Sequence, residues 1–282
     1  MSEIYSVAGH RFAFRGVLAD EIVNIPAFSV FLTDAEEADF FFEDSQESEV
    51  PEMAECQYCF EYEDVKGEFG RCEKGYMMSL CPESKPALYL WSSLADNVVH
   101  LCGNYEVYLL RFALWIGFGL KTSHSNTLAV HSSCIVKDGK AVLFLGESGT
   151  GKSTHTRLWR ENIEGSFLLN DDSPVLREEE GRIVVYGSPW SGKTPCYKAE
   201  AYELAACVRL SQAPANSISR LAVLQAYGAL HPSCPPQFAY DEYLYDGISA
   251  TLSAILQAVP CYSMACLPDA DAARMSCKTI FG

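Results

Sequence analysis

Hydrophobic and polar positions alternate in short runs through the first hundred residues, which is the pattern of β-strands separated by turns. CQYCFEYE, GEFGRCE, YMMSLC and ALYLWSS follow one another between residues 56 and 93. From Asn104 to about Phe118 the apolar residues recur all round a helical period, which predicts a largely buried helix ended by Gly117 and Gly119. Residues 1–120 are therefore expected to form a strand-rich region that ends in a buried helix.

Beyond residue 120, strand-like and helix-like segments alternate. NTLAVHSSCIV and AVLFLG read as two strands joined by a turn at residues 137–140. The alternation continues through FLLN, RIVVYG, AEAYELAACVRL, LAVLQAYGAL, ISATLSAILQA, CYSMACL and DADAARMSC. Such a succession is typical of α/β architecture. We predict an α/β chain, α+β overall, with a second domain over residues 121–282.

Composition and charge narrow the class of protein. A hydrophobic content of 49% over 282 residues is ample for a folded core. The net charge of −16 argues against a binder of nucleic acid or of anionic membranes. The opening MSEIYSVAGHRFAFRG lacks the basic-then-apolar order of a signal peptide, and the apolar stretch from Leu109 to Leu120 is broken by Arg111. We expect a cytoplasmic protein without nucleic-acid or membrane partners.

The twelve cysteines are expected to be reduced thiols, mostly small core residues. Cys56 and Cys59, with Cys72 and Cys81 beyond them, could also be drawn as a four-thiolate zinc site. Strands in this region would place every other residue in a core, and no second C-x2-C follows. Buried thiols are therefore the favoured interpretation of these four cysteines.

Two glycine-rich stretches fit the phosphate-loop (Walker A) pattern G-x-x-x-x-G-K-[ST]: GESGTGKS at 146–153 and GSPWSGKT at 187–194. In such a loop, backbone N–H groups and a helix N-terminus face the phosphates, the Lys reaches them, and the Ser or Thr ligates Mg²⁺. The first stretch follows the apolar run AVLFL and precedes the predicted helix THTRLWREN. About twenty residues later a predicted strand ends in Asp171 and Asp172, carboxylates suited to a metal and a nucleophile. We predict the nucleotide site at 146–153.

The second stretch fails as an independent phosphate loop. Pro189 removes an N–H donor, Trp190 is bulky where phosphate must approach, and Pro195 weakens the helix signal that should follow. The predicted strand RIVVYG runs into it, and strand-end loops of such sheets face the ligand crevice. Lys193 and Ser191 are therefore candidates for approaching the γ-phosphate or the acceptor. The alternative is a surface turn whose Trp190 packs on the core.

The stretch LAVHSSCIVKDGKAVLFLGESGTGKST, followed by LLNDDSPV, resembles the nucleotide-binding core shared by HPr kinase/phosphorylases and phosphoenolpyruvate carboxykinases. Three features carry the resemblance: His131, on the strand before the loop strand and fifteen residues before Gly146, the loop itself, and the pair Asp171–Asp172. The likeness covers about residues 126–175 and continues more faintly in VPCYSMACLPDADAARM. Residues 1–100 show no recognisable match.

The resemblance implies a role for each matched residue. Lys152 would bind the β- and γ-phosphates, and Ser153 would ligate the metal. Asp171 is favoured as a metal ligand and Asp172 as the base, although the two could exchange roles. His131 would lie beside the transferring phosphoryl; a strand histidine bonded to a backbone carbonyl is the alternative. The implied nucleotide-binding set is Gly146, Ser148, Gly149, Thr150, Gly151, Lys152, Ser153 and Thr154.

The sequence also departs from both families. The chain is much shorter than a carboxykinase and shows none of the Arg and Lys motifs that handle oxaloacetate, so decarboxylation is not expected. HPr kinases usually carry an acidic residue directly after Gly-Lys-Ser, where this chain has Thr154-His155. Their C-terminal docking signature is not evident either, so HPr is not the expected acceptor.

The leading hypothesis is a kinase that uses ATP or GTP with Mg²⁺ and transfers the γ-phosphoryl to a hydroxyl of a peptide, protein or small molecule. Two alternatives stay open: a nucleotide-sensing binding protein without transfer activity, and a hydrolase or carboxykinase-like enzyme. A homo-oligomer is possible because relatives often assemble. Lys193→Ala is expected to lower transfer and largely spare nucleotide binding.

Overall fold

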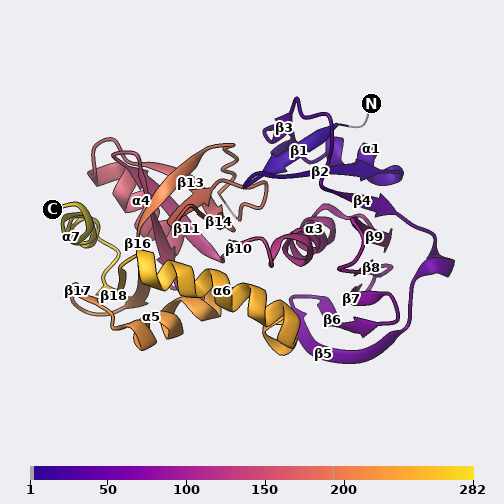
Figure 1. Ribbon diagram of the computed structural model, residues 1–282. Helices are drawn as coiled ribbons and strands as arrows, with labels where there is room; N and C mark the ends of the chain where they lie inside the picture. The colour runs from indigo at the N-terminus through magenta and orange to yellow at the C-terminus, as the bar shows by residue number, and fades with distance from the viewer. Residues whose placement is uncertain (1–2, 193) are drawn as a thin grey trace. The chain divides into compact units, whose positions relative to one another are not determined.

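The computed structural model of the protein describes residues 3–192 and 194–282 (Figure 1). Two compact units divide the chain. Unit 1 comprises Met1–His124 and Gln237–Tyr245, and unit 2 comprises Ser125–Pro236 and Asp246–Gly282. The sequence-based boundary at residue 120 lies inside a helix, and the short returning segment 237–245 has no local signal of its own.

Unit 1 is built on a nine-stranded sheet in the order β3-β1-β2-β4-β9-β8-β7-β6-β5. Only the pairs β2–β4 and β4–β9 are parallel. The strands are β1 (Ile4–Val7), β2 (His10–Arg15), β3 (Leu32–Thr33), β4 (Phe40–Asp44), β5 (Met53–Tyr62), β6 (Val65–Cys72), β7 (Gly75–Pro82), β8 (Leu88–Ser92) and β9 (Val98–Gly103). Its helices are α1 (Val17–Val23), α2 (Pro26–Ser29), η1 (Glu47–Glu49) and α3 (Val107–Thr122).

The sheet of unit 1 curves around helix α3 (Figure 1). Strand β6 shows why its strands have an inner face: Val65 and Phe69 are buried, whereas Lys66 and Glu68 are exposed. This period of two follows from the pleat of a strand. No helix in the described residues is long and apolar enough to cross a membrane, α3 included.

Helix α3 continues to Thr122, so the prediction that Gly117 and Gly119 end it is wrong. The two glycines serve packing instead. A Cβ at Gly117 would lie 2.7 Å from the ring of Phe42, and one at Gly119 would lie 2.8 Å from the ring of Phe238. Because real Cβ atoms essentially never come this close, the absence of a side chain lets these rings pack on the helix backbone.

All twelve cysteines are free thiols. The prediction that the four cysteines of the strand region are buried is right for Cys72 alone, because Cys56, Cys59 and Cys81 are exposed. A strand has two faces, and these three side chains lie on the one that faces solvent. Cys72 packs with Met77 and Trp91 in a core cluster.

Asp241 fixes the returning segment within unit 1. Its carboxylate, 3% exposed, accepts hydrogen bonds from Tyr76 Oη at 2.8 Å and Arg71 Nε at 2.8 Å, and Arg71 Nη2 lies 2.7 Å away. It also accepts from the backbone N–H of Leu244 at 3.1 Å. Burial alone would raise the pKa of Asp241, but the bonds from Tyr76, Leu244, Arg71 and Gln57 outweigh it and lower this pKa.

Unit 2 contains the second sheet, in the order β10-β14-β15-β16-β12-β11-β13, with β18 pairing β16 and β17. The pairs β12–β16 and β16–β18 are parallel. The strands are β10 (Thr127–Ala129), β11 (Ser132–Lys137), β12 (Lys140–Leu145), β13 (Phe167–Asp172), β14 (Val175–Glu179), β15 (Arg182–Tyr186), β16 (Ala201–Gln212), β17 (Ser217–Arg220) and β18 (Cys261–Cys266). Its helices are α4 (Lys152–Asn162), α5 (Val223–Leu230), η2 (His231–Ser233) and α7 (Ala270–Phe281). The elements η3 (Pro236–Tyr240) and α6 (Glu242–Ala258) contain the points at which the chain changes unit.

Both faces of this sheet carry helices, as the α/β prediction requires. On one face, Phe144 of β12 packs with Trp159 of α4 and with Ala273 of α7 in a single core cluster. On the other face, Arg209 of β16 donates from Nη1 to the carbonyl of Ala229 in α5 at 3.1 Å. The molecule is thus mixed α/β with two large mixed sheets.

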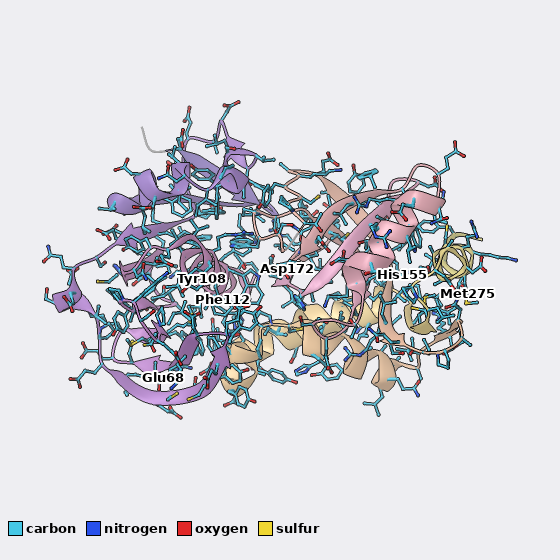
Figure 2. All side chains as sticks on the ribbon, turned by 180° about the vertical axis from the view of Figure 1, so that it is seen from behind. Glu68, Tyr108, Phe112, His155, Asp172 and Met275 are labelled. Atoms are coloured by element: carbon cyan, nitrogen blue, oxygen red, sulfur yellow. The ribbon has the colours of Figure 1, made fainter. Side chains whose placement is uncertain are left out.

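His155 is buried where α4 meets α7 (Figure 2). Its Nε2 lies 3.1 Å from Ser276 Oγ, which also accepts from Trp159 Nε1 at 2.9 Å. The ring packs edge-on against Phe144 at 4.6 Å between centroids. Burial lowers the pKa of His155 to about 4, because the charged imidazolium would lose its hydration.

We expect Asp241→Ala to destabilise the protein by about 3 kcal/mol, because Tyr76 and Arg71 would lose their hydrogen-bond acceptor. The free energy of unfolding, measured in urea by tryptophan fluorescence, tests this, with the exposed Asp246→Ala as control. The lowered pKa of Asp241 means that its contribution is complete above the unfolded value near 4 and is lost as the pH falls further. A change within about 0.5 kcal/mol of wild type would contradict the assigned role.

The buried His155 predicts a second pH dependence. Between pH of about 6.5 and 4, His155 is protonated in the unfolded chain but not in the folded chain. The free energy of unfolding therefore falls as the pH drops through this range. The loss reaches about 3 kcal/mol near pH 4. His155→Leu should flatten this slope, whereas removal of the exposed His124 should not. Parallel pH profiles of the unfolding free energy in wild type and His155→Leu would show the idea to be wrong.

Candidate functional site

The first glycine stretch lies between the end of β12 and the start of α4. Gly149 and Gly151 adopt φ values of 82° and 101°, in the left-handed region that favours glycine. Thr150 closes the turn, because its Oγ1 donates to the carbonyl of Glu147 at 2.8 Å. The chain therefore passes from strand through a tight loop into a helix, which is the local context that the sequence predicted for a phosphate loop.

Lys152 is the first residue of α4, and its ammonium group is buried within the loop. Nζ donates to the carbonyls of Gly146 at 2.7 Å and Glu147 at 3.1 Å, and it lies 3.0 Å from His131 Nε2. An ammonium group has three hydrogens, so these three acceptors use all of them. Desolvation lowers the pKa of Lys152, against the attraction of nearby carboxylates.

His131 bridges Lys152 and Asp172. It lies at a bend directly before β11, so the prediction that it belongs to the strand is wrong by one residue. Its Nδ1 is 3.1 Å from Asp172 Oδ1. Because an ammonium group can only donate, Nε2 accepts from Lys152, and Nδ1 then carries the hydrogen that faces Asp172. The two ring nitrogens thus face two side chains, Lys152 and Asp172, rather than a backbone carbonyl.

Ser153 and Asp171 meet beside this line of residues. Ser153 Oγ donates to Asp171 Oδ1 at 3.0 Å, and Ser133 Oγ donates to the same oxygen at 2.6 Å. Asp171 is buried, whereas Ser153 and the side chain of Asp172 reach solvent. Sequence reasoning did not single out Ser133, which lies opposite Asp171 in the β11–β13 ladder. In the sequence, the one signal for this contact was that Ser132 and Ser133 directly follow His131.

The oxygen pair of Ser153 and Asp171 fits Mg²⁺. Magnesium takes oxygen ligands at about 2.1 Å in an octahedron, which places adjacent ligands about 3.0 Å apart. Ser153 Oγ and Asp171 Oδ1 are 3.0 Å apart as hydrogen-bonding partners, and two adjacent ligands of the ion could keep this spacing. These two residues could hold the ion, and Lys152 could turn from the loop carbonyls towards a bound anion.

Asn170 joins the second glycine stretch to the Asp171–Asp172 pair. Its buried amide nitrogen lies within hydrogen-bonding distance of the carbonyls of Ser188, at 3.2 Å, and Trp190, at 3.3 Å. Its Oδ1 accepts from the backbone N–H groups of Asp172 at 3.1 Å and Ser173 at 2.9 Å. One carboxamide thus cross-links two loops. Asn170 was missed as a site residue although it directly precedes the two aspartates.

Ser191 and Gly192 of the second glycine stretch lie beside the carboxylates. Ser191 forms an isolated bridge with Asp172, and the N–H of Gly192 donates to the carbonyl of Asp171 at 2.8 Å. Trp190 is buried, as the surface-turn alternative expected. Lys193 lies outside the described residues, and the roles predicted for it and for Ser191 stay predictions.

An open surface hollow of about 430 Å³ lies beside the glycine loop. Gln212 donates from Nε2 to the carbonyl of Gly149 at 3.1 Å, and Arg209 Nη2 lies 3.7 Å from a carboxylate oxygen of Glu147. The lining residues are Glu147, Ser148, Gly149, Thr150, Arg209, Leu210, Ser211 and Gln212. The sequence did not predict the contribution of β16 to this lining, because only the pairing of β12 with β16 brings these residues to the loop.

The structure therefore brings together Lys152, Ser153, His131, Asp171 and Asp172. Of the other predicted residues, Thr154 is the third residue of α4, while the remaining loop residues flank these groups. The arrangement offers a buried cation, a hydroxyl–carboxylate pair and a second, solvent-reaching carboxylate at the end of one loop. Such groups can bind an anion with a divalent cation and accept a proton nearby.

Comparisons with known proteins give little beyond this geometry. No protein-family model matches the chain, and no curated protein matches it either. Among solved structures, the Hpr(Ser) kinase/phosphatase from Coxiella burnetii matches with 13% sequence identity and a TM-score of 0.31. The match covers 52% of this chain and 90% of that chain. These values do not place the chain in a family, and its resemblance to HPr kinases stays a prediction.

Proposed function

We propose that the protein is a nucleotide-dependent kinase that transfers the γ-phosphoryl of ATP or GTP to a hydroxyl group. The observation that carries this proposal is the line Lys152–His131–Asp172 beside the Ser153–Asp171 pair, all at the end of one glycine loop. A cation for the phosphates, oxygens for a metal and a carboxylate for a hydroxyl are the groups that phosphoryl transfer needs.

Lys152 acts as the phosphate-binding cation. Its three present acceptors are two loop carbonyls and the imidazole of His131, and the oxygens of a phosphate are stronger partners because they are charged. Burial lowers the pKa of Lys152, and the negative charge of a bound phosphate would raise this pKa again. The side chain therefore exchanges its contacts with the loop for contacts with the ligand.

Ser153 and Asp171 hold Mg²⁺ in this proposal. When bound, the ion neutralises negative charge on the phosphates. Ser133 keeps the Asp171 carboxylate in place through its bond at 2.6 Å. A buried carboxylate with two hydroxyl donors has few alternative orientations, so this oxygen is preorganised for the cation.

Asp172 accepts the proton of the acceptor hydroxyl. Its carboxylate reaches solvent, where an acceptor can approach, and its Oδ1 lies 3.1 Å from His131 Nδ1. The acceptor lies on the side of Ser191 and Gly192, the part of the second glycine stretch that contacts the Asp171–Asp172 pair. The acceptor is a hydroxyl group of a peptide, a protein or a small molecule.

Substitutions at Lys152 and Asp172 should separate binding from transfer. Lys152→Ala is expected to abolish both, because the phosphates lose their buried cation. Asp172→Asn should retain nucleotide binding and lower transfer about 10²- to 10⁴-fold, because the base is lost. Calorimetry with ATP and Mg²⁺, and transfer from γ-labelled ATP into a cell lysate, measure the two properties. The exposed Lys140 supplies the control Lys140→Ala.

The following results would contradict the proposal. Absence of nucleotide binding by the wild type, or unchanged transfer in Lys152→Ala, contradicts a nucleotide site in this loop. Binding by a wild type that labels no acceptor indicates a nucleotide sensor. Release of phosphate into water without an acceptor indicates a hydrolase.

Gly192→Ala tests the acceptor side. A Cβ there would lie 2.9 Å from the carbonyl oxygen of Asp171 and 3.3 Å from Asp172 Cβ, so the loop must shift away from the carboxylates. We expect transfer to fall at least tenfold while nucleotide affinity stays within about twofold, since misplacement of a substrate by 1 Å can cost about 10²-fold. Gly228→Ala, where a Cβ meets nothing within 4 Å, is the control. Equal losses of affinity and transfer would contradict an acceptor-side role.

A further inference from the structure

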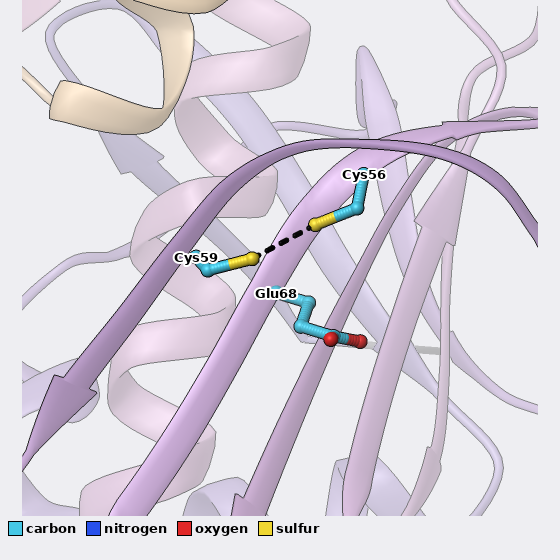
Figure 3. A group of neighbouring side chains, drawn as sticks. All are labelled: Cys56, Cys59 and Glu68. Carbon is cyan, nitrogen blue, oxygen red and sulfur yellow. Dashed lines mark hydrogen bonds between the residues drawn. The ribbon is translucent and has the colours of Figure 1, made fainter.

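Cys56 and Cys59 lie side by side on the solvent face of β5, far along the chain from the glycine loop. Their Sγ atoms are 3.1 Å apart, and both side chains are exposed (Figure 3). In a regular strand, residues separated by three positions point to opposite faces. A pair at this spacing on one face therefore requires an irregularity in the strand.

A β-bulge provides that irregularity. In the β5–β6 ladder Cys56 is paired with Gly70, whereas Tyr58 is paired with Phe69, so Gln57 is an extra residue on β5. The bulge returns Cys59 to the face of Cys56. Gly70 permits the close approach of the strands, since a Cβ there would lie only 1.9 Å from the carbonyl oxygen of Glu55. The local backbone thus brings two thiols together that a regular ladder would separate.

Glu68 completes the group. It is the direct partner of Cys59 in the ladder and is exposed on the same face (Figure 3). One ligand atom from each of the three residues lies within 4.8 Å of the others. The four-thiolate arrangement considered from the sequence does not form, because Cys72 packs in the core cluster and Cys81 belongs to β7, opposite Lys66.

The donor set selects the kind of cation. Two thiolates and one carboxylate suit a borderline-soft ion such as Zn²⁺, whereas Mg²⁺ and Ca²⁺ require oxygen ligands. In a tetrahedral zinc site the sulfurs would stand about 3.7 Å apart, which exposed side chains reach by small rotations. A net charge of −16 on the chain also favours the accumulation of cations at its surface.

We propose that Cys56, Cys59 and Glu68 form a Zn²⁺-binding site on the solvent face of β5 and β6, with the fourth coordination position open to water or to a partner's ligand. The two thiols release their protons to solvent as the Zn–S bonds form, and the carboxylate binds in its ionised state. No redox step is involved. The site is independent of the proposed kinase function.

Zinc titration of the full chain tests the proposal. The protein is kept reduced with a phosphine, Mg²⁺ is present in excess to occupy oxygen-only sites, and a chromophoric chelator competes for Zn²⁺. We expect one tightly bound Zn²⁺ per chain in the wild type. The double variant Cys56→Ser/Cys59→Ser should bind at least about 100-fold more weakly, and Glu68→Gln about tenfold more weakly.

Cobalt substitution identifies the ligands. Co²⁺ at the site should give sulfur-to-metal charge-transfer absorption that disappears in the double cysteine variant. Matched controls are Cys81→Ser and Glu83→Gln, which change exposed residues of the same types outside the group. Circular dichroism should show that every variant is folded, because the three residues lie on the solvent face.

Three results would overturn the proposal. The first is a wild type that binds no Zn²⁺ although thiol titration finds Cys56 and Cys59 reduced. The second is undiminished binding in the double cysteine variant. The third is a disulfide between the two cysteines that forms in air and persists in the reductant, which would make the pair a structural cross-link instead.

Discussion

The direction of three neighbouring strands governs the candidate site. Strand β11 pairs antiparallel with both β12 and β13, so β12 and β13 run the same way and end at the same edge of the sheet. At this edge the glycine loop follows the last residue of β12, and β13 ends in the two aspartates. His131 lies directly before the first residue of β11, which runs between these two strands. Lys152, His131 and Asp172 meet because of this strand order, which also places Ser133 opposite Asp171.

Hydrogen-bond satisfaction then fixes the individual side chains. Burial of an ammonium group is tolerated only with partners, and Lys152 has an acceptor for each of its three hydrogens. Asn170 links two loops in a similar way, since its buried carboxamide forms hydrogen bonds with two backbone carbonyls and two backbone N–H groups. Because the ammonium group of Lys152 is already partnered within the protein, a ligand must offer stronger partners to displace it. Charged phosphate oxygens meet that condition.

In unit 1 an irregular strand brings two reactive side chains together. Its nine strands form one sheet, and Asp241 ties in the returning segment by accepting hydrogen bonds from Arg71, Tyr76 and the N–H of Leu244. One extra residue at Gln57 breaks the pleat and gathers Cys56 and Cys59 at the surface. The cost of a bulge is small at the outermost strand, where one side of the ladder is already unpaired. Chemistry-bearing side chains thus lie on both units by different local means.

The sequence determined the local elements. Apolar alternation indicated the strand-rich first part, and the order apolar strand, GESGTGKS and amphipathic helix placed Lys152 and Ser153 at a helix start. Other contributions depended on tertiary structure alone. Arg209 and Gln212 reach the loop only through the parallel pairing of β12 with β16, and Asn170 acquires its role from carbonyls eighteen and twenty residues away. Cys56 and Cys59 were wrongly expected to be buried because alternation along a strand does not show how far the strand is covered, and no residue of β5 is buried. That both lie on one face follows from a bulge, which depends on the partner strand. Local periodicity reports what a residue does along its own backbone; which distant group it meets is decided by how the strands pair.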